Sequence, residues 1–327
     1  MTQYLNTSQV PLSLAVFLAS DSYDHEENVI SATTLLKPIR QVILSSRIAK
    51  EDQSVDLIQM LPSRMGSAIH DAIETSWTTN YDRAMAALGY PKKIIERVII
   101  NPNQEEELPD WAIPIYLEQR AYKQVGKYRV SGKFDFVGEG FLEDFKTTSA
   151  YTYIRGSKDE DYILQGSIYR WLNPKIITRD QMAIQFIFTD WSKAKAMADP
   201  KYPKQRTVRK VFDLKSVAET DRYVHQRLHL FDQYWDAPEH SLPQCTDAEL
   251  WRSDPVFKYY KNPDKLSRST KNFDSRQEAY IRLAEDGGKG TVIERPGEVT
   301  ACKYCSGFSL CSQKDLLIER GDLQLTP

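Results

Sequence analysis

Two aspartates and a lysine lie close together in the segment SGKFDFVGEGFLEDFKTTSA, which begins at Ser131. Apolar residues on each side of Gly138-Glu139-Gly140 predict two short strands joined by a tight turn, with Asp135 on the first strand and Asp144 and Lys146 on the second. Strand side chains alternate between faces, so Asp144 and Lys146 point the same way. Carboxylates bind hard cations such as Mg²⁺ or Mn²⁺, which activate water for attack on a phosphodiester, and a nearby lysine can orient that water or stabilise developing negative charge. The segment therefore predicts metal-assisted phosphodiester hydrolysis.

An Asp-x-Lys pair on its own is typical of a solvated strand face with a weak ion pair. Here the pair belongs to a larger set in a fixed order along the chain. Gly132 precedes Asp135 in a Gly-x-x-Asp pattern, and Gln165 and Tyr169 follow at i and i+4 on the next predicted helix. The order and spacing of the whole set are more specific than any one of its residues.

In these motifs the chain resembles the PD-(D/E)xK nuclease superfamily, in its RecB-like branch, over residues 30–191. Its C-terminal tail, with a Pro-x-Cys-Thr-Asp segment at Cys245, looks closer to the phage-type members. Gly66–His70 matches the Gly-x-x-x-His motif of that branch, and Glu118 matches a glutamate on the strand before the first aspartate. The divalent-metal ligands that the resemblance implies are His70, Glu118, Asp135, Asp144 and the carbonyl of Phe145. It also implies that Lys146 assists the attacking water, and that Gln165 and Tyr169 line the active site and contact DNA.

The resemblance implies a DNA nuclease that depends on Mg²⁺ or Mn²⁺. Because most of this branch processes ends, we expect an exonuclease that acts on DNA ends or single strands in replication, recombination or repair. Two alternatives stay open: a structure-specific endonuclease with the same site, and a non-catalytic DNA-binding or assembly module that keeps the fold. The chain has no G-x-x-x-x-G-K-[ST] motif, so unwinding would need a partner such as a helicase or a recombination or replication protein.

The cysteines are clustered like metal ligands. Cys302, Cys305 and Cys311 form a C-x2-C-x5-C pattern, and Cys245 is the remaining cysteine. Some RecB-like nucleases are similar in holding a [4Fe–4S] cluster with such a trio and one distant cysteine. In those proteins the distant cysteine precedes the nuclease core, whereas Cys245 follows it. Zn²⁺ is the alternative metal, and four unligated cysteines in a reducing cytosol are the plainer interpretation.

Two basic regions are candidates for a DNA groove. Residues 192–215 contain eight Lys or Arg against two Asp. The second region interleaves cations with aromatic residues, which suit phosphates and unpaired bases respectively: Lys258, Tyr259, Tyr260, Lys261, Lys265, Arg268, Lys271 and Phe273. Ordinary solvated loops explain either region equally well. His225 and His229 stand at i and i+4 without nearby carboxylate or cysteine support, so we expect them on a helix surface.

The elements that must position these residues predict an α/β fold. We expect a restriction-endonuclease-like core with a central mixed β-sheet flanked by helices, a helical N-terminal segment and a cysteine-stapled C-terminal region. The predicted helices cover residues 30–48, 61–77, 161–172 and 214–235. The predicted domains are residues 1–110, which carry the Gly-x-x-x-His motif, residues 111–235, the nuclease core, and residues 236–327, the metal-cluster region packed on the core.

Length and composition fit this architecture. A chain of 327 residues with 41% hydrophobic residues can bury a substantial core. Its net charge of −2 excludes a molecule that is basic over its whole surface, so any nucleic-acid surface is local. The N-terminal apolar run is short and lacks a basic flank, and no segment approaches the length of a bilayer span. We therefore expect a soluble protein without a membrane partner, located in the cytoplasm, which is that of the host if a phage encodes the chain.

Overall fold

The structure is a computed structural model that describes residues 3–20, 26, 29–49, 54–103 and 107–325. Contacts group the chain into two units that differ from the three predicted segments. Unit 1 consists of Met1–Leu36 and Lys50–His229, and unit 2 consists of Lys37–Ala49 and Leu230–Pro327. Residues on both sides of position 110 share unit 1 because one strand before it pairs with one after it. Among the described residues, every helix is too short or too polar to cross a membrane.

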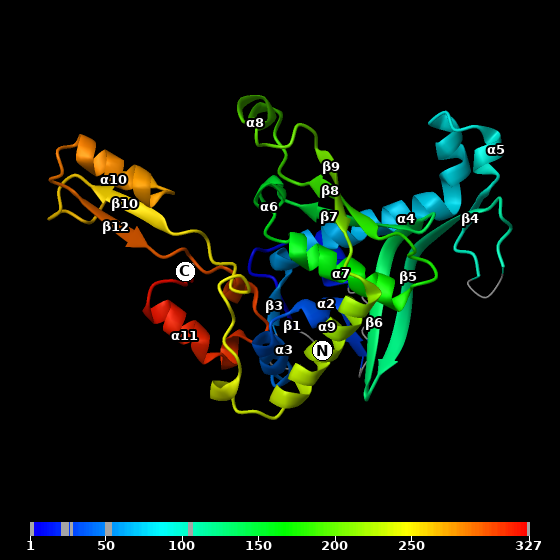
Figure 1. Cartoon of the computed structure of the whole chain (residues 1–327), viewed down its shortest axis with the longest axis horizontal. Helices are drawn as coiled ribbons and strands as arrows, with labels where there is room; N and C mark the ends of the chain where they lie inside the picture. The colour runs from blue at the N-terminus through cyan, green and yellow to red at the C-terminus, as the bar shows by residue number, and fades with distance from the viewer. Residues whose placement is uncertain (1–2, 21–25, 27–28, 50–53, 104–106, 326–327) are drawn as a thin grey trace. The chain divides into compact units, whose positions relative to one another are not determined.

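A mixed sheet of seven strands forms the centre of unit 1 (Figure 1). The strand order is β4-β5-β6-β7-β8-β9, with β2 beside β6. Neighbours are antiparallel except for β4 with β5, β7 with β8 and β2 with β6, which are parallel. The bounds are β2 Val29–Ser31, β4 Val98–Ile100, β5 Ile113–Val125, β6 Tyr128–Gly138, β7 Phe141–Thr148, β8 Gln181–Phe188 and β9 Thr207–Asp213. The predicted α/β class with a mixed sheet is confirmed.

The turn between β6 and β7 fits its sequence. Glu139 has φ 49° and Gly140 has φ 79°, so both central residues are in the left-handed region that a two-residue hairpin turn requires. The connection from β7 to β8 is longer because parallel strands need a crossover, which α6 (Ala150–Arg155) and α7 (Asp159–Leu172) supply. The tight turn places the strand with Asp135 beside the strand with Asp144.

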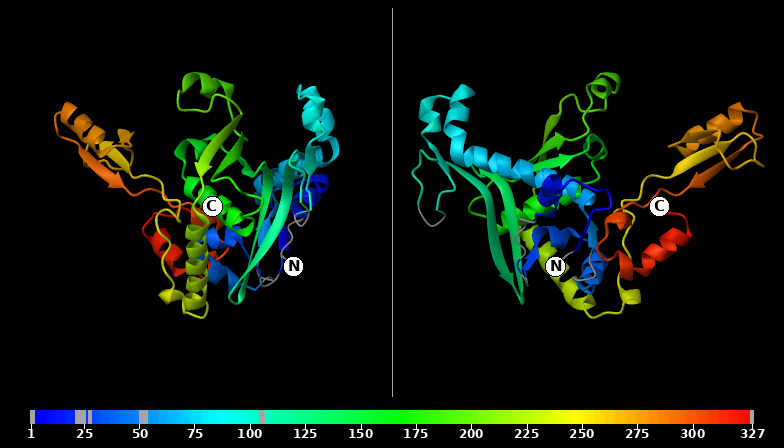
Figure 2. Two further views of the ribbon diagram at one scale, coloured as in Figure 1. Left: turned by 45° about the vertical axis from the view of Figure 1, so that its right-hand side comes forward. Right: turned by 180° about the vertical axis from the view of Figure 1, so that it is seen from behind.

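Helices α4 (Leu61–Ala87) and α7 cover opposite faces of β7 and β8. A Cβ on Gly166 of α7 would lie 2.1 Å from Met182 Sδ, and Met182 pairs with Leu142, which shares a face with Asp144. A Cβ on Gly66 of α4 would lie 3.1 Å from Thr147 Oγ1, on the other face. Figure 1 shows α7 in front of the strands, and the rear view in Figure 2 shows α4 in front. Asp144 and Lys146 therefore face α7.

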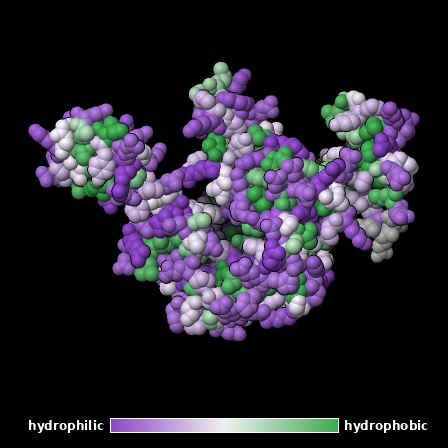
Figure 3. Space-filling model, in the orientation of Figure 1, coloured by the Kyte–Doolittle hydropathy of each residue, from purple (hydrophilic) through white to green (hydrophobic). Residues whose placement is uncertain are grey.

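The remaining helices of unit 1 are shorter, apart from α9. They are α1 Leu12–Ala19, α2 Ala32–Leu36, α5 Lys92–Ile95 and α8 Lys193–Ala198, with a 3-10 turn at Leu57–Met60, and α9 Val217–Tyr234 runs from unit 1 into unit 2. Two short strands, β1 Gln3–Leu5 and β3 Ser54–Asp56, pair in parallel. The helix predicted over residues 30–48 is divided at Pro38, as expected, and its first two residues belong to β2. Hydrophilic residues cover most of the face shown in Figure 3.

Unit 2 contains a small antiparallel sheet in the order β11-β10-β12. Its elements are α3 Ile39–Ser46, β10 Val256–Tyr260, β11 Lys271–Phe273, α10 Arg276–Glu285, β12 Thr291–Arg295 and α11 Ser312–Glu319, with 3-10 turns at Glu239–Ser241, Ala301–Tyr304 and Phe308–Leu310. Tyr259 is 0% exposed, Tyr260 4% and Phe273 9%. The expectation that these rings stack on unpaired bases is wrong, because they pack inside this unit.

Candidate active site

The site forms where β6 and β7 separate. The two strands pair from the turn as far as Phe136 and Glu143. One residue further, the backbone N–H of Phe145 donates a hydrogen bond to Asp135 Oδ2 at 2.8 Å, so a carboxylate takes the place of a strand partner. Asp135 is only 8% exposed, and this bond fixes its orientation. At this fork, where β6 and β7 separate, the Asp135 carboxylate of β6 can bond to the backbone of β7.

Asp144 and Lys146 form an ion pair on β7, next to this fork. Lys146 Nζ lies 2.6 Å from Asp144 Oδ2, and Asp144 is 1% exposed. Burial and the nearby Asp135 carboxylate raise the pKa of Asp144 to about 6, although Lys146 opposes the shift. Burial alone would lower the pKa of Lys146, but Asp144 and Asp135 outweigh it and raise that pKa. At neutral pH the lysine is therefore a fixed cation beside two carboxylates.

His70 and Glu118 complete a compact set of potential ligands. His70 Nδ1 lies 3.4 Å from Glu118 Oε1 and 3.5 Å from Asp135 Oδ1. His70 Nε2 donates a hydrogen bond to the Phe145 carbonyl oxygen at 3.0 Å. Ligand atoms of His70, Glu118 and Asp135 all lie within 4.8 Å of one another. Of the five implied ligands, the structure thus brings three together, while the Phe145 carbonyl accepts a hydrogen bond from His70 and Asp144 is paired with Lys146.

The register of β5 with β6 places Glu118 beside this set. Leu117 stands opposite Phe136 and Gln119 opposite Phe134, so Glu118 is opposite Asp135. The φ of 50° at Glu118 is unusual for a residue other than glycine, and such backbone strain is concentrated at functional sites. Lys133 Nζ holds the carboxylate at 2.5 Å.

The charge of His70 follows from these contacts. Burial would lower its pKa, but the hydrogen bonds of Asp135 and Glu118 outweigh that effect and raise the pKa of His70 to about 10. Burial likewise would raise the pKa of Asp135, yet His70 and Lys146 hold it below its ordinary value. At neutral pH the site therefore contains an imidazolium between carboxylates.

Helix α7 contributes a second row of residues. Gln165 Nε2 donates to the Tyr169 hydroxyl at 2.8 Å, which is the i,i+4 contact that the sequence predicts. Tyr169 is 5% exposed, and a Cβ on Gly132 would lie 2.9 Å from its ring. Tyr169 thus holds Gln165 in place from a buried position. One turn earlier, Tyr162 places its ring centroid 5.9 Å from Lys146 Nζ, a neighbour that the Gln-x-x-x-Tyr motif does not include.

A cavity of about 820 Å³ opens onto these groups. His70, Glu118, Asp135 and Lys146 line it together with residues that sequence reasoning missed, of which the cations are Arg64, Arg120 and Lys133. Arg120 stands directly opposite Lys133 in the β5–β6 register. Strand alternation is the sequence signal for these two cations, because Lys133 lies two residues before Asp135 and Arg120 lies two residues after Glu118. The cavity offers carboxylates for a metal and cations for a phosphate.

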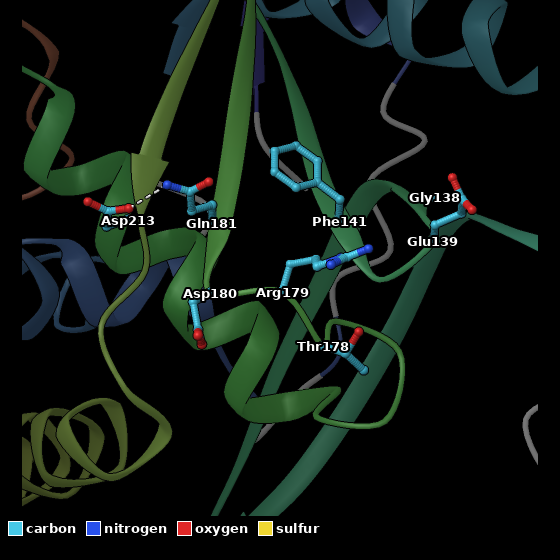
Figure 4. A pocket seen from close by; sticks show the side chains of 8 residues that line it. All are labelled: Gly138, Glu139, Phe141, Thr178, Arg179, Asp180, Gln181 and Asp213. Carbon is cyan, nitrogen blue, oxygen red and sulfur yellow. Dashed lines mark hydrogen bonds between the residues drawn. The ribbon is translucent and has the colours of Figure 1, made fainter.

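A second cavity of about 700 Å³ lies near the β6–β7 turn and the start of β8 (Figure 4). Gln181 and Asp213, which share a hydrogen bond of 2.7 Å, line it together with Gly138, Glu139, Phe141, Thr178, Arg179 and Asp180. It contains none of the predicted site residues, so the chemistry belongs to the first cavity.

The four cysteines gather within unit 2. Cys245 and Cys302 pack against the same apolar cluster. The Cys245 backbone N–H donates to Gln313 Oε1 at 2.8 Å, and Gln313 Nε2 donates to the Cys245 carbonyl at 2.9 Å. Since Gln313 is two residues after Cys311, this reciprocal pair holds the distant cysteine beside the trio.

The thiols of this group influence one another. Burial, the Glu249 carboxylate and the thiols of Cys311 and Cys305 raise the pKa of Cys245 to about 12. Burial and the same two thiols raise the pKa of Cys302 to about 11. The four thiols therefore lie near one another, and cysteine sulfurs are the donors that a thiolate-bound metal centre uses.

In the folded chain, cations of the first basic region are paired with carboxylates. In residues 192–215, Arg209 lies 3.5 Å from Glu143, Lys210 pairs with Asp159 at 2.5 Å and Lys215 with Glu160 at 2.8 Å. Part of the predicted positive charge is therefore neutralised within unit 1. His225 and His229 are exposed on α9, as predicted.

Comparisons with known proteins give little beyond this geometry. No family model and no curated protein matches the chain. Among solved structures, a protein named SSO0001 is similar with 16% identity and a TM-score of 0.41, over 68% of this chain and 88% of that one. A phage-related exonuclease from Haemophilus somnus 129PT is similar with 14% identity and a TM-score of 0.26, over 37% of this chain and 60% of that one.

Proposed function

We propose that this chain is a divalent-metal-dependent DNA nuclease that hydrolyses phosphodiesters at DNA ends or in single strands. One observation supports the proposal above all: ligand atoms of His70, Glu118 and Asp135 lie within 4.8 Å of one another in a cavity that Lys146, the partner of Asp144, also lines. An imidazole nitrogen and two carboxylate oxygens suit a divalent cation, and Mg²⁺ or Mn²⁺ is the natural choice for a carboxylate-rich site. Asp144 and the Phe145 carbonyl, which follow one another in the sequence, would complete the set of ligands for this cation.

The bound cation would polarise the phosphoryl group and lower the pKa of the attacking water. Lys146 is held as a cation by Asp144 and can orient that water or stabilise the charge that develops on the phosphate oxygens. Gln165, fixed by Tyr169, presents an amide towards the same side of the sheet. Arg120 and Lys133 on the cavity wall offer positive charge to the phosphates of the strand.

The cysteines support a second, structural cofactor. We assign Cys245, Cys302, Cys305 and Cys311 to a [4Fe–4S] cluster, with Zn²⁺ as the alternative. The pairing of Cys245 with Gln313 supports its place as the fourth ligand. Thiolate ligation would tie residues 239–245 to the C-terminal trio inside unit 2.

DNA is the proposed partner, and the preference for ends follows from the resemblance to RecB-like nucleases. The test is cleavage of end-labelled single strands, linear duplex and covalently closed circles with Mg²⁺ and with Mn²⁺. We expect the linear substrates to be shortened and the circle to stay intact. Nicking of the circle would favour the structure-specific endonuclease, and no cleavage with either metal would favour a non-catalytic DNA-binding module.

A matched pair of variants separates the site from contamination. Lys146→Ala removes the fixed cation, and a loss of about 10²–10³-fold in rate is expected for such a stabilising group. His225→Ala removes an exposed imidazole on α9 and should leave cleavage unchanged. Equal rates for Lys146→Ala and wild type would reject the site.

A further inference from the structure

Arg40 is a buried arginine that contacts one of the cysteines. It lies on α3 with only 4% of its surface exposed. Its Nε donates to Cys311 Sγ at 3.1 Å, Nη1 donates to the Leu242 carbonyl at 3.1 Å and Nη2 donates to Ser312 Oγ at 3.3 Å. The Glu239 carboxylate forms an ion pair with Nη2. Arginine is almost never fully buried unless it is paired, and here its planar fork is held by four partners of unit 2.

The contact with Cys311 identifies the sulfur as an acceptor. A guanidinium has donors and no acceptor, and a neutral thiol is only a weak acceptor. The Nε–H therefore donates to Cys311 Sγ, and a cysteine sulfur bound to a metal can accept the same hydrogen bond. Glu239 already balances the charge of Arg40, so charge pairing alone does not explain why Nε points at Cys311.

The segment Lys37–Ala49 belongs to unit 2 although its neighbours in sequence belong to unit 1. A Cβ on Gly307, between Cys305 and Cys311, would lie 2.8 Å from Leu44 Cβ, so α3 packs directly on the cysteine segment. Helix α3, which carries Arg40, therefore lies against the segment that holds Cys305 and Cys311.

We infer that Arg40 positions Cys311 and balances the negative charge of a metal centre bound by Cys245, Cys302, Cys305 and Cys311. The inference rests on the proposed thiolate-bound centre and not on the nuclease reaction. A cation hydrogen-bonded to a ligand sulfur stabilises the thiolate and slows loss of the metal. In an iron–sulfur cluster it also favours the reduced state, which carries one more negative charge, because net charge and hydrogen bonds to sulfur set the reduction potential.

The test compares Arg40→Lys with Arg47→Lys after anaerobic purification of the full chain. Arg47 follows the same helix, and its Nη2 donates to the carbonyls of Trp235 at 2.9 Å and Ala237 at 2.6 Å, so it is a matched arginine that bonds only backbone oxygens in these contacts. Iron, labile sulfide and zinc per chain are measured, followed by the rate of metal loss to a chelator. We expect Arg40→Lys to lose its metal about 10–100-fold faster than wild type, and Arg47→Lys to match wild type.

A second variant guards against misfolding of Arg40→Lys. Glu239→Gln keeps Arg40 in place and removes the competing negative charge, so more of its positive charge acts on the sulfur. In an iron–sulfur protein the midpoint potential, followed by electron paramagnetic resonance, should fall in Arg40→Lys and rise in Glu239→Gln. In a zinc protein the rate of zinc loss should rise in the first variant and fall in the second.

Two results would overturn the inference. In the first, Arg40→Lys and Glu239→Gln both lose metal at the wild-type rate. In the second, the wild-type chain binds neither iron nor zinc. DNA cleavage by the same wild-type preparation reports on the nuclease proposal separately. Cleavage with no effect of Arg40→Lys on metal loss rejects this inference alone.

Discussion

Binding of Mn²⁺ at His70 is predicted to release a proton. In the metal-free protein, Asp135 and Glu118 overcome the effect of burial and raise the pKa of His70 to about 10. A histidine binds a metal through a neutral imidazole, so the cation has to displace the proton of His70. At about pH 7.5, roughly two to three pH units below this pKa, deprotonation of His70 costs about 3 kcal/mol of the metal's binding free energy. As the pH rises towards 10 the cost falls, so the affinity for Mn²⁺ should increase about tenfold for each pH unit.

Calorimetric titration of Mn²⁺ in two buffers of different ionisation enthalpy measures this proton directly. We expect about one proton released per Mn²⁺ near neutral pH, because His70 supplies it while Asp135, whose pKa lies below its ordinary value, carries none there. His70→Gln is the control and should release none. Release of no proton by wild type, or an affinity that stays constant between about pH 7 and pH 9, would refute the assignment of His70 as a ligand.

Three further predictions concern the same face of the sheet. Burial and Asp135 raise the pKa of Asp144 to about 6, so kcat/KM for DNA should fall as the pH drops below this value and the carboxylate gains a proton; a flat profile down to pH 5 would contradict it. Tyr169→Phe removes the acceptor for Gln165 and about 1 kcal/mol of hydrogen bonding, so cleavage should slow about fivefold while the melting temperature changes little. Gly166→Ala places a methyl group 2.1 Å from Met182 Sδ and should lower the free energy of unfolding by about 1–3 kcal/mol in urea titrations; an unchanged midpoint would show that the sulfur moves aside.

The sequence predicts the local parts of this site well. Alternation places Asp144 and Lys146 on one face, the turn at Glu139 and Gly140 joins their strand to that of Asp135, and helical spacing pairs Gln165 with its tyrosine. Each of these relations spans only a few residues, so the periods of strand and helix determine them.

The same local patterns do not predict contacts between segments that are far apart in the chain. The position of Glu118 opposite Asp135 depends on the register of β5 with β6, and the contact of Arg40 with Cys311 joins residues far apart in the chain. The stacking role expected of Tyr259 failed for a related reason: an aromatic residue beside lysines has the same sequence pattern whether it faces solvent or a small core. Such outcomes are decided by tertiary packing, which overrides local pattern.

The most direct test of a metal-dependent nuclease centre at the β6–β7 fork is cleavage of end-labelled linear DNA by wild type, Asp135→Asn and His225→Ala with Mn²⁺ present and then chelated. Asp135→Asn keeps the shape of the side chain and removes the charge that faces His70. We predict cleavage by wild type and by His225→Ala that stops on chelation, and a loss of at least about 10²-fold in Asp135→Asn. Cleavage that persists without metal, or an Asp135→Asn variant as active as wild type, would contradict the account.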